Sequence, residues 1–222
     1  MKGAHKMDIM DYFEEQLKQN FPQQRIHAIR ALLDESYEIV DEMYRRNSDQ
    51  LLTSTHLGKD IRADILRACI AHVAQKYCYD GILPYKFATP TNHAKNSHHV
   101  RLSNANISIY FARVETSQEV PRYALYRPTY NNIQGTLFGE NNWDLSPVNV
   151  FCVTYGDSGE SQFKYGNIGV LGKSSWLSKL PLTQGAYVCS KPHEKEELLV
   201  ELADALKDDL KKDDKDARGS KN

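Results

Sequence analysis

The sequence predicts an α+β fold, in which N-terminal amphipathic helices pack on a mainly antiparallel β-sheet and a C-terminal helix closes the domain. Apolar residues repeat every three or four positions in residues 8–80. Alternating or continuous apolar runs, typical of strands, follow in residues 100–190. A leucine stripe returns after Pro192. Because helical and strand patterns are segregated and do not alternate, we expect an α+β rather than an α/β arrangement.

The helical part, residues 8–80, is expected to hold three helices. The first covers residues 8–20, the second starts at Pro22 and runs to about Arg46, and the third ends at Asp80-Gly81. Proline is tolerated in the first turn of a helix, and glycine commonly follows the last turn. The strongest periodicity is in the second helix, where the apolar face comprises Ile26, Ile29, Leu33, Tyr37, Val40 and Tyr44.

The middle of the chain begins with a stretch that is rich in turn-forming residues. Residues 84–106 carry repeated Pro, Asn and Ser and are predicted to be a loop. Residues 107–114 alternate and predict a strand, and residues 120–127 predict its hairpin partner after a short polar connection. A second long loop is expected over residues 128–146.

The remaining strands are predicted from apolar runs between glycines. Residues 148–155 indicate a buried strand, and residues 161–165 and 168–171 indicate two more, interrupted at Gly166. A short strand is expected at 186–189, inside the β-rich part at 100–190. Hairpin-length connections favour antiparallel pairing.

The C-terminal part is predicted to close the domain and then to lose structure. Residues 192–210 have a leucine stripe and predict a helix, whereas residues 211–222 are almost entirely charged and predict a disordered tail. We therefore expect residues 1–210 to form a single α+β domain.

The composition is that of a globular protein and indicates no partner by itself. Of 222 residues, 41% are apolar and 26% charged, and the net charge is −1. No run of 18 apolar residues suits a membrane span and no signal peptide is recognisable, which predicts a soluble, cytoplasmic protein without a membrane partner. The four cysteines form no C-x-x-C pair, and we expect reduced thiols.

A histidine cluster is the first candidate site. His93, His98 and His99 lie within the predicted loop, close to Arg101, and suggest a hydrolase or nuclease that uses an imidazole as acid or base. Adjacent histidines on extended backbone point to opposite sides, and the loop contains no Cys, Asp or Glu. We therefore expect neither a metal nor a cofactor there.

Other catalytic patterns are absent where their chemistry would require them. The acid-x-lysine spacing of metal-dependent nucleases is matched at residues 213–215, but these lie in the charged tail and not on a predicted strand. The serines that follow Gly156-Asp157 and Gly172-Lys173 fit neither a nucleophile elbow nor a phosphate-binding loop. Both segments are predicted to be plain turns.

A basic, aromatic-rich segment supports the leading hypothesis, a nucleic-acid-binding or accessory protein. Residues 84–130 contain six Lys or Arg and two acids, a balance of +4, with tyrosines and phenylalanines interleaved. Such groups suit phosphates and unstacked bases. The candidate nucleic-acid-binding residues are Lys95, Arg101, Arg113, Arg122, Tyr126 and Arg127.

Strand alternation leaves an alternative open for this segment. Arg113 shares a strand face with Ile107, Ile109 and Phe111, so it lies at the edge of a buried face or pairs with a carboxylate there. An ordinary mixed surface is then the alternative. A third hypothesis is a protein–protein interaction module, or a homo-oligomer, that pairs through the N-terminal helices.

Overall fold

The computed structural model describes residues 9–46, 61–91, 95, 98–121, 149–157, 162–172 and 175–182. Its helices are α1 (Ile9–Asn20), α2 (Gln23–Arg46) and α5 (Arg62–Tyr79). Where the sequence predicted a helix end, these three helices agree with it to within about two residues. In the described ranges no helix has both the length and the apolar character needed to cross a membrane.

The strands form one sheet whose order follows the sequence, β1-β2-β3-β4-β5-β6. They are β1 (Lys86–Ala88), β2 (Arg101–Ser103), β3 (Ser108–Arg113), β4 (Val150–Gly156), β5 (Tyr165–Leu171) and β6 (Trp176–Pro181). All neighbours pair antiparallel except β3 and β4, which are parallel. The predicted α+β class with a mainly antiparallel sheet is confirmed.

Two details of the strand prediction are wrong. Residues 84–106 are not only loop, because β1 and β2 lie within them and pair antiparallel. Gly166 does not interrupt a strand but lies inside β5. A Cβ on Gly166 would lie 2.6 Å from the Thr154 carbonyl oxygen, so the close approach of β4 explains the glycine.

Strand β3 has neighbours that differ from those expected. It pairs with β2 on one side and with β4 on the other. Val120 and Pro121, the start of the predicted strand at 120–127, belong to no strand. Residues 122–127, the loop at 128–146, the strand at 186–189, the helix at 192–210 and the tail at 211–222 lie outside the described residues.

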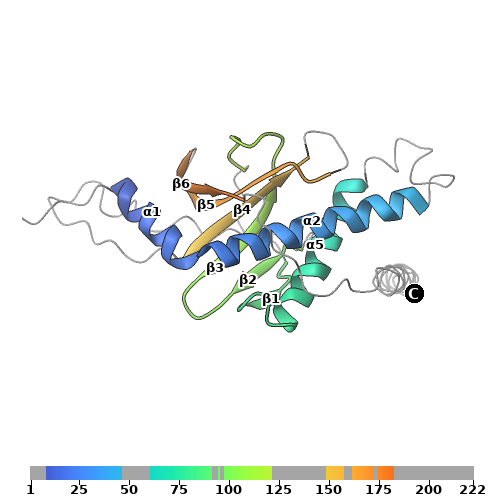
Figure 1. Ribbon diagram of the computed structural model, residues 1–222, viewed down its shortest axis with the longest axis horizontal. Helices are drawn as coiled ribbons and strands as arrows, with labels where there is room; N and C mark the ends of the chain where they lie inside the picture. The colour runs from blue at the N-terminus through green and yellow to red at the C-terminus, as the bar shows by residue number, and fades with distance from the viewer. Residues whose placement is uncertain are drawn as a thin grey trace, which may run out of the picture.

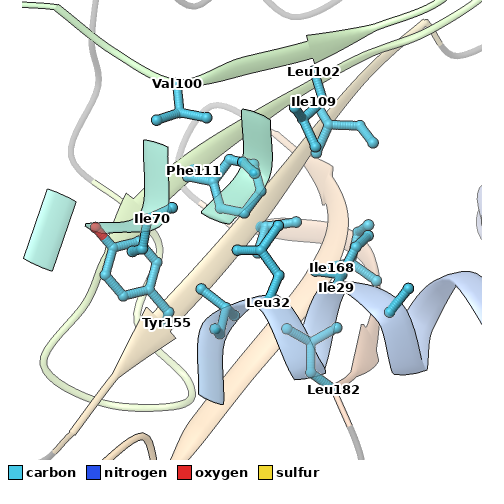
Figure 2. Packing of buried hydrophobic residues seen from close by; sticks show 14 of the residues in the cluster. Ile29, Leu32, Ile70, Val100, Leu102, Ile109, Phe111, Tyr155, Ile168 and Leu182 are labelled. Atoms are coloured by element: carbon cyan, nitrogen blue, oxygen red, sulfur yellow. The ribbon is translucent and has the colours of Figure 1, made fainter. Parts of the chain in front are cut away.

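Helices α1, α2 and α5 lie on one face of the sheet, with α2 crossing in front of the strands (Figure 1). Helix α1 contacts β6 and α5 contacts β1, so the two shorter helices lie near opposite edges of the sheet. Figure 2 shows Ile29 and Leu32 of α2 near Ile168 of β5, and Ile109 of β3 beside Leu102 of β2; all five belong to one core cluster. The strand residues in this core are alternate ones, as expected when one sheet face is buried.

We call the opposite side of the sheet, away from the helices, the outer face. The segment after β3 crosses part of it: Asn167 Nδ2 donates to the Ser117 carbonyl at 2.8 Å, and Trp176 Nε1 donates to the Glu119 carbonyl at 3.3 Å. Beneath it Ala112, Cys152 and Leu171 form a small second apolar cluster. The β4–β6 part of the outer face is therefore covered by the chain itself.

Candidate nucleic-acid interface

The β1–β2 hairpin carries the basic residues in a regular antiparallel frame. Lys86 pairs with Ser103 and Ala88 with Arg101, and an isolated bridge joins Thr91 to His98. All three pairs have the same register, so the hairpin continues without a bulge from Lys86 to Thr91. Residues 81–114 contain no Asp or Glu. The described part of the hairpin thus forms one edge of the sheet, and its sequence carries no acidic residue.

Strand alternation places Lys86 and Arg101 on the outer face. Phe87 and Leu102 join the main core, so their neighbours in β1 and β2 project to the other side. Arg101 is opposite Tyr110 of β3. We define the hairpin surface as Lys86, Lys95, His99 and Arg101.

The cations of the hairpin surface differ from those of the helices in their partners. Among the residues that the structure describes, Lys86, Lys95 and Arg101 have no carboxylate oxygen within 4.0 Å. The Arg101 Nε atom is buried and has no hydrogen-bond partner there. The cations that form ion pairs are Lys18, Arg30, Arg45, Arg46, Arg62, Arg67, Lys76 and Arg113.

The two described histidines of the cluster lie on different sides of the hairpin. His98 is exposed, and its Nδ1 lies 3.1 Å from the Thr89 carbonyl oxygen. The His99 ring is half-buried against Tyr110, with 5.6 Å between ring centroids. His93 lies outside the described residues. Within the described ranges, no three His, Cys, Asp or Glu side chains gather as a metal site would require.

Arg113 belongs to an ion-pair cluster and not to the hairpin surface. Its Nη2 lies 3.1 Å and 3.2 Å from the two carboxylate oxygens of Asp157. Arg62 of α5 contacts Asp157 at 3.4 Å and Asp41 of α2 at 2.7 Å. The Asp157 side chain is only 3% exposed. Arg113 is therefore paired with a carboxylate at the edge of the sheet, which is the alternative that strand alternation left open.

The ion-pair cluster joins three parts of the fold at the carboxyl ends of β3 and β4. Although burial of the guanidinium opposes it, Asp157 raises the pKa of Arg113. Burial raises the pKa of Asp41, against the hydrogen bond from Arg62. Burial, together with Asp157 and Tyr155, raises the pKa of the nearby Tyr37 far above its ordinary range. The raised pKa values keep the Arg113 guanidinium charged and the Tyr37 hydroxyl protonated near neutral pH.

Sequence reasoning did not identify Asp157 or Lys86 as site residues. Asp157 follows directly after the buried strand β4, and an acid at the end of a buried strand is a signal that could have identified it. The sequence instead predicts a turn for this segment. Lys86 was counted in the charge balance and not assigned to a site. Of the other candidates, Arg122, Tyr126 and Arg127 lie outside the described residues.

A cleft of about 580 Å³ runs along α2 and offers no catalytic group that matches the hydrolase hypothesis. Its carboxylates include Asp34, which pairs with Arg30, and Glu42, which pairs with Arg45. The lining residues are Arg30, Asp34, Tyr37, Glu38, Asp41, Glu42, Arg45, Gln162 and Phe163. Neither His98 nor His99 is among them.

The apolar faces of the N-terminal helices pack inside the chain. Ile29, Leu33, Tyr37 and Val40, on the predicted apolar face of α2, are all buried in its own core. Large apolar side chains that remain exposed in the described ranges are Met10, Ile61 and Tyr79. Pairing of these helices with a partner or a second copy stays a prediction.

No protein-family model matches the sequence, and no curated protein or solved structure is significantly similar to it.

Proposed function

We propose that this chain binds nucleic acid through the hairpin surface, as an accessory protein that contacts the phosphate backbone. The observation that carries the proposal is the contrast in ion pairing. The helical cations mostly have carboxylate partners, whereas Lys86, Lys95 and Arg101 have none in the described structure. Unpaired cations gain the full free energy of counterion release when they meet a phosphate.

The chemistry of the hairpin surface supports backbone contacts rather than base reading. Tyr110 is 4% exposed, so its ring is not available to stack on a base. The remaining groups are ammonium, guanidinium and imidazole, which bind phosphate oxygens and carry little sequence information. We expect affinities typical of non-specific binding, with a dissociation constant of about 10⁻⁴–10⁻⁶ M at physiological salt.

The test compares two triple variants that remove the same charge. The first replaces Lys86, Lys95 and Arg101 with Gln. The matched control replaces Lys18, Arg45 and Arg67 with Gln, which are paired helical cations with side chains 63%, 75% and 51% exposed. Binding to a fluorescein-labelled oligonucleotide is followed by anisotropy over a range of salt concentrations.

The hairpin variant is expected to reduce the magnitude of the negative slope of log K against log salt by about 2–3, since each lost phosphate contact removes roughly 0.7–0.9 from it. The control is expected to change the slope by less than about 1. Equal losses in both variants would show that net charge, and not the hairpin, governs binding. Absence of any salt-dependent binding by the unmodified chain would refute the proposal itself.

A further inference from the structure

The β1–β2 hairpin extends past its pairing with β3. In the described residues β2 pairs with β3 as far as Arg101 and Tyr110. The two strands of the hairpin are still paired three residues farther on, at Thr91 and His98, which corresponds to about 10 Å of strand. Thr91, Lys95 and His98 are all exposed. We call this two-stranded end, which comprises Thr91, Lys95 and His98, the distal ribbon.

The aromatic rings at the base of the hairpin are turned into the protein. Phe87 packs against the main core, and Tyr85 and Tyr110 are only 7% and 4% exposed. Proteins that hold single strands without sequence preference stack the bases on accessible aromatic rings. These three rings are buried against the protein and cannot serve in this way. The hairpin therefore presents cations on a narrow ribbon, a shape that suits a groove better than it suits unstacked bases.

The dimensions of the distal ribbon match the major groove of B-form DNA. That groove is about 12 Å wide and about 8.5 Å deep, and it admits a two-stranded β-ribbon. Arg101 marks the base of the ribbon, about 10 Å from Thr91 along the strands, so it lies near the phosphates when the ribbon fills the groove. The major groove of A-form RNA is deep and too narrow for side chains to enter.

We propose that the ligand of the hairpin surface is double-stranded DNA, with the distal ribbon in the major groove and Lys86 and Arg101 on the phosphate backbone. The inference rests on the proposed nucleic-acid binding and names its ligand. Lys86 and Arg101 share the outer face, and Lys95 lies in the connection between Thr91 and His98. No acid occurs in residues 81–114, so this part of the chain carries no negative charge to repel the duplex.

The experiment compares four labelled ligands of one sequence by anisotropy in roughly 0.1 M salt. They are a short DNA duplex, one of its single strands, the same duplex as RNA, and the DNA duplex with bulky substituents on C5 of thymine, which lies in the major groove. Three phosphate contacts alone favour a duplex over a single strand by about fourfold, so the DNA duplex should exceed this preference. The RNA duplex and the substituted duplex keep the phosphates but should bind more weakly.

Lys95→Gln tests the distal ribbon, with Lys18→Gln as the control. Loss of one phosphate contact should weaken binding to the DNA duplex by about eightfold at this salt, with a smaller effect on the RNA duplex that the ribbon cannot enter. Lys18 is exposed, pairs with Glu14 on α1 and is not part of the hairpin, so its replacement should change both affinities equally and by less. Melting temperatures show that both variants are folded.

The outcomes separate this inference from the proposed function. Equal binding of the DNA and RNA duplexes, or no effect of the C5 substituents, would overturn insertion into the groove while the phosphate contacts stand. Tighter binding of the single strand would also overturn it. If none of the four nucleic acids binds, the proposed function fails, and the inference fails with it.

Discussion

Replacement of Asp157 by Asn tests the ion-pair cluster that joins α2, α5 and the ends of β3 and β4. The change keeps the size of the side chain but removes its charge. Arg113 contacts both carboxylate oxygens of Asp157, so the amide of Asn presents N–H groups to at least one guanidinium donor. Arg62 retains Asp41, whereas Asp157 is the one acid that pairs with Arg113 in the described ranges. The variant should therefore be markedly less stable.

The magnitude follows from how deeply each partner is buried. Removal of one partner from a fully buried ion pair costs about 3–5 kcal/mol, and an exposed pair contributes about 0–1 kcal/mol. Asp157 is 3% exposed, but Arg113 is 44% exposed, so water solvates part of its charge in the variant. We expect a loss of about 2–3 kcal/mol in the free energy of unfolding, between these two limits.

Urea unfolding followed by circular dichroism measures this loss, with Asp64→Asn as the matched control. Asp64 pairs with Arg67 at 2.8 Å, but the two side chains are 68% and 51% exposed. Its removal should cost less than about 1 kcal/mol. In thermal melts D157N should melt about 4–12 °C lower, since 1 kcal/mol corresponds to roughly 2–4 °C at this size. If both variants lose equal stability, the cluster has no special structural role.

Four further predictions concern the core, the sheet and the buried thiols. Leu32→Ala should lower the free energy of unfolding by about 2–5 kcal/mol, because Leu32 is fully buried. The control Met10→Ala, at a half-exposed site, should change it by less than about 0.5 kcal/mol in the same urea experiment. Gly156→Ala should lower the free energy of unfolding, measured in urea, by about 1–3 kcal/mol or more, because the new Cβ would lie 2.5 Å from the Val114 carbonyl oxygen. Unchanged stability would contradict the register of β3 and β4. Burial raises the pKa of Cys69 to about 12 and that of Cys78 to about 11. At about pH 8 both thiols are therefore protonated and unreactive in the folded chain, and a thiol reagent should label them only after unfolding. The experiment uses a Cys189→Ser variant, so that Cys189 does not contribute to the labelling. These raised values also predict that stability falls above about pH 8.5, where the unfolded thiols ionise and the folded ones do not; a flat urea midpoint from about pH 8.5 to pH 10 would contradict this.

The helices could be predicted because their signal is local. The apolar face of α2 repeats every three or four residues, and this period depends only on neighbouring sequence. The signals for β3 and β4 are local as well: alternation predicts β3, and a continuous apolar run predicts the buried strand β4. The pairing of Arg113 with an acid was left open by alternation alone, because the acid that completes it comes from another strand.

Long-range partners and very short strands could not be read from the sequence. Asp157 is 44 residues from Arg113 and reaches it only because β3 and β4 are parallel. Strands β1 and β2 have three residues each, too few to show a period; β2 is held by its pairing with β3, and β1 by its pairing with β2. Strand β6, which no pattern predicted, has half-buried residues and ends in Pro181 at the edge of the sheet.

The single parallel pair divides the sheet into two antiparallel units of consecutive strands, β1–β3 and β4–β6. Within each unit, every strand pairs with its neighbour in sequence. The ladder between β3 and β4 instead requires residues 114–149 to bring distant segments together, as with Ser108 and Val150. Closing such a loop costs entropy before any contact forms. We therefore expect each unit to assemble early and the β3–β4 seam to form last, so that this seam sets the folding rate of the whole sheet.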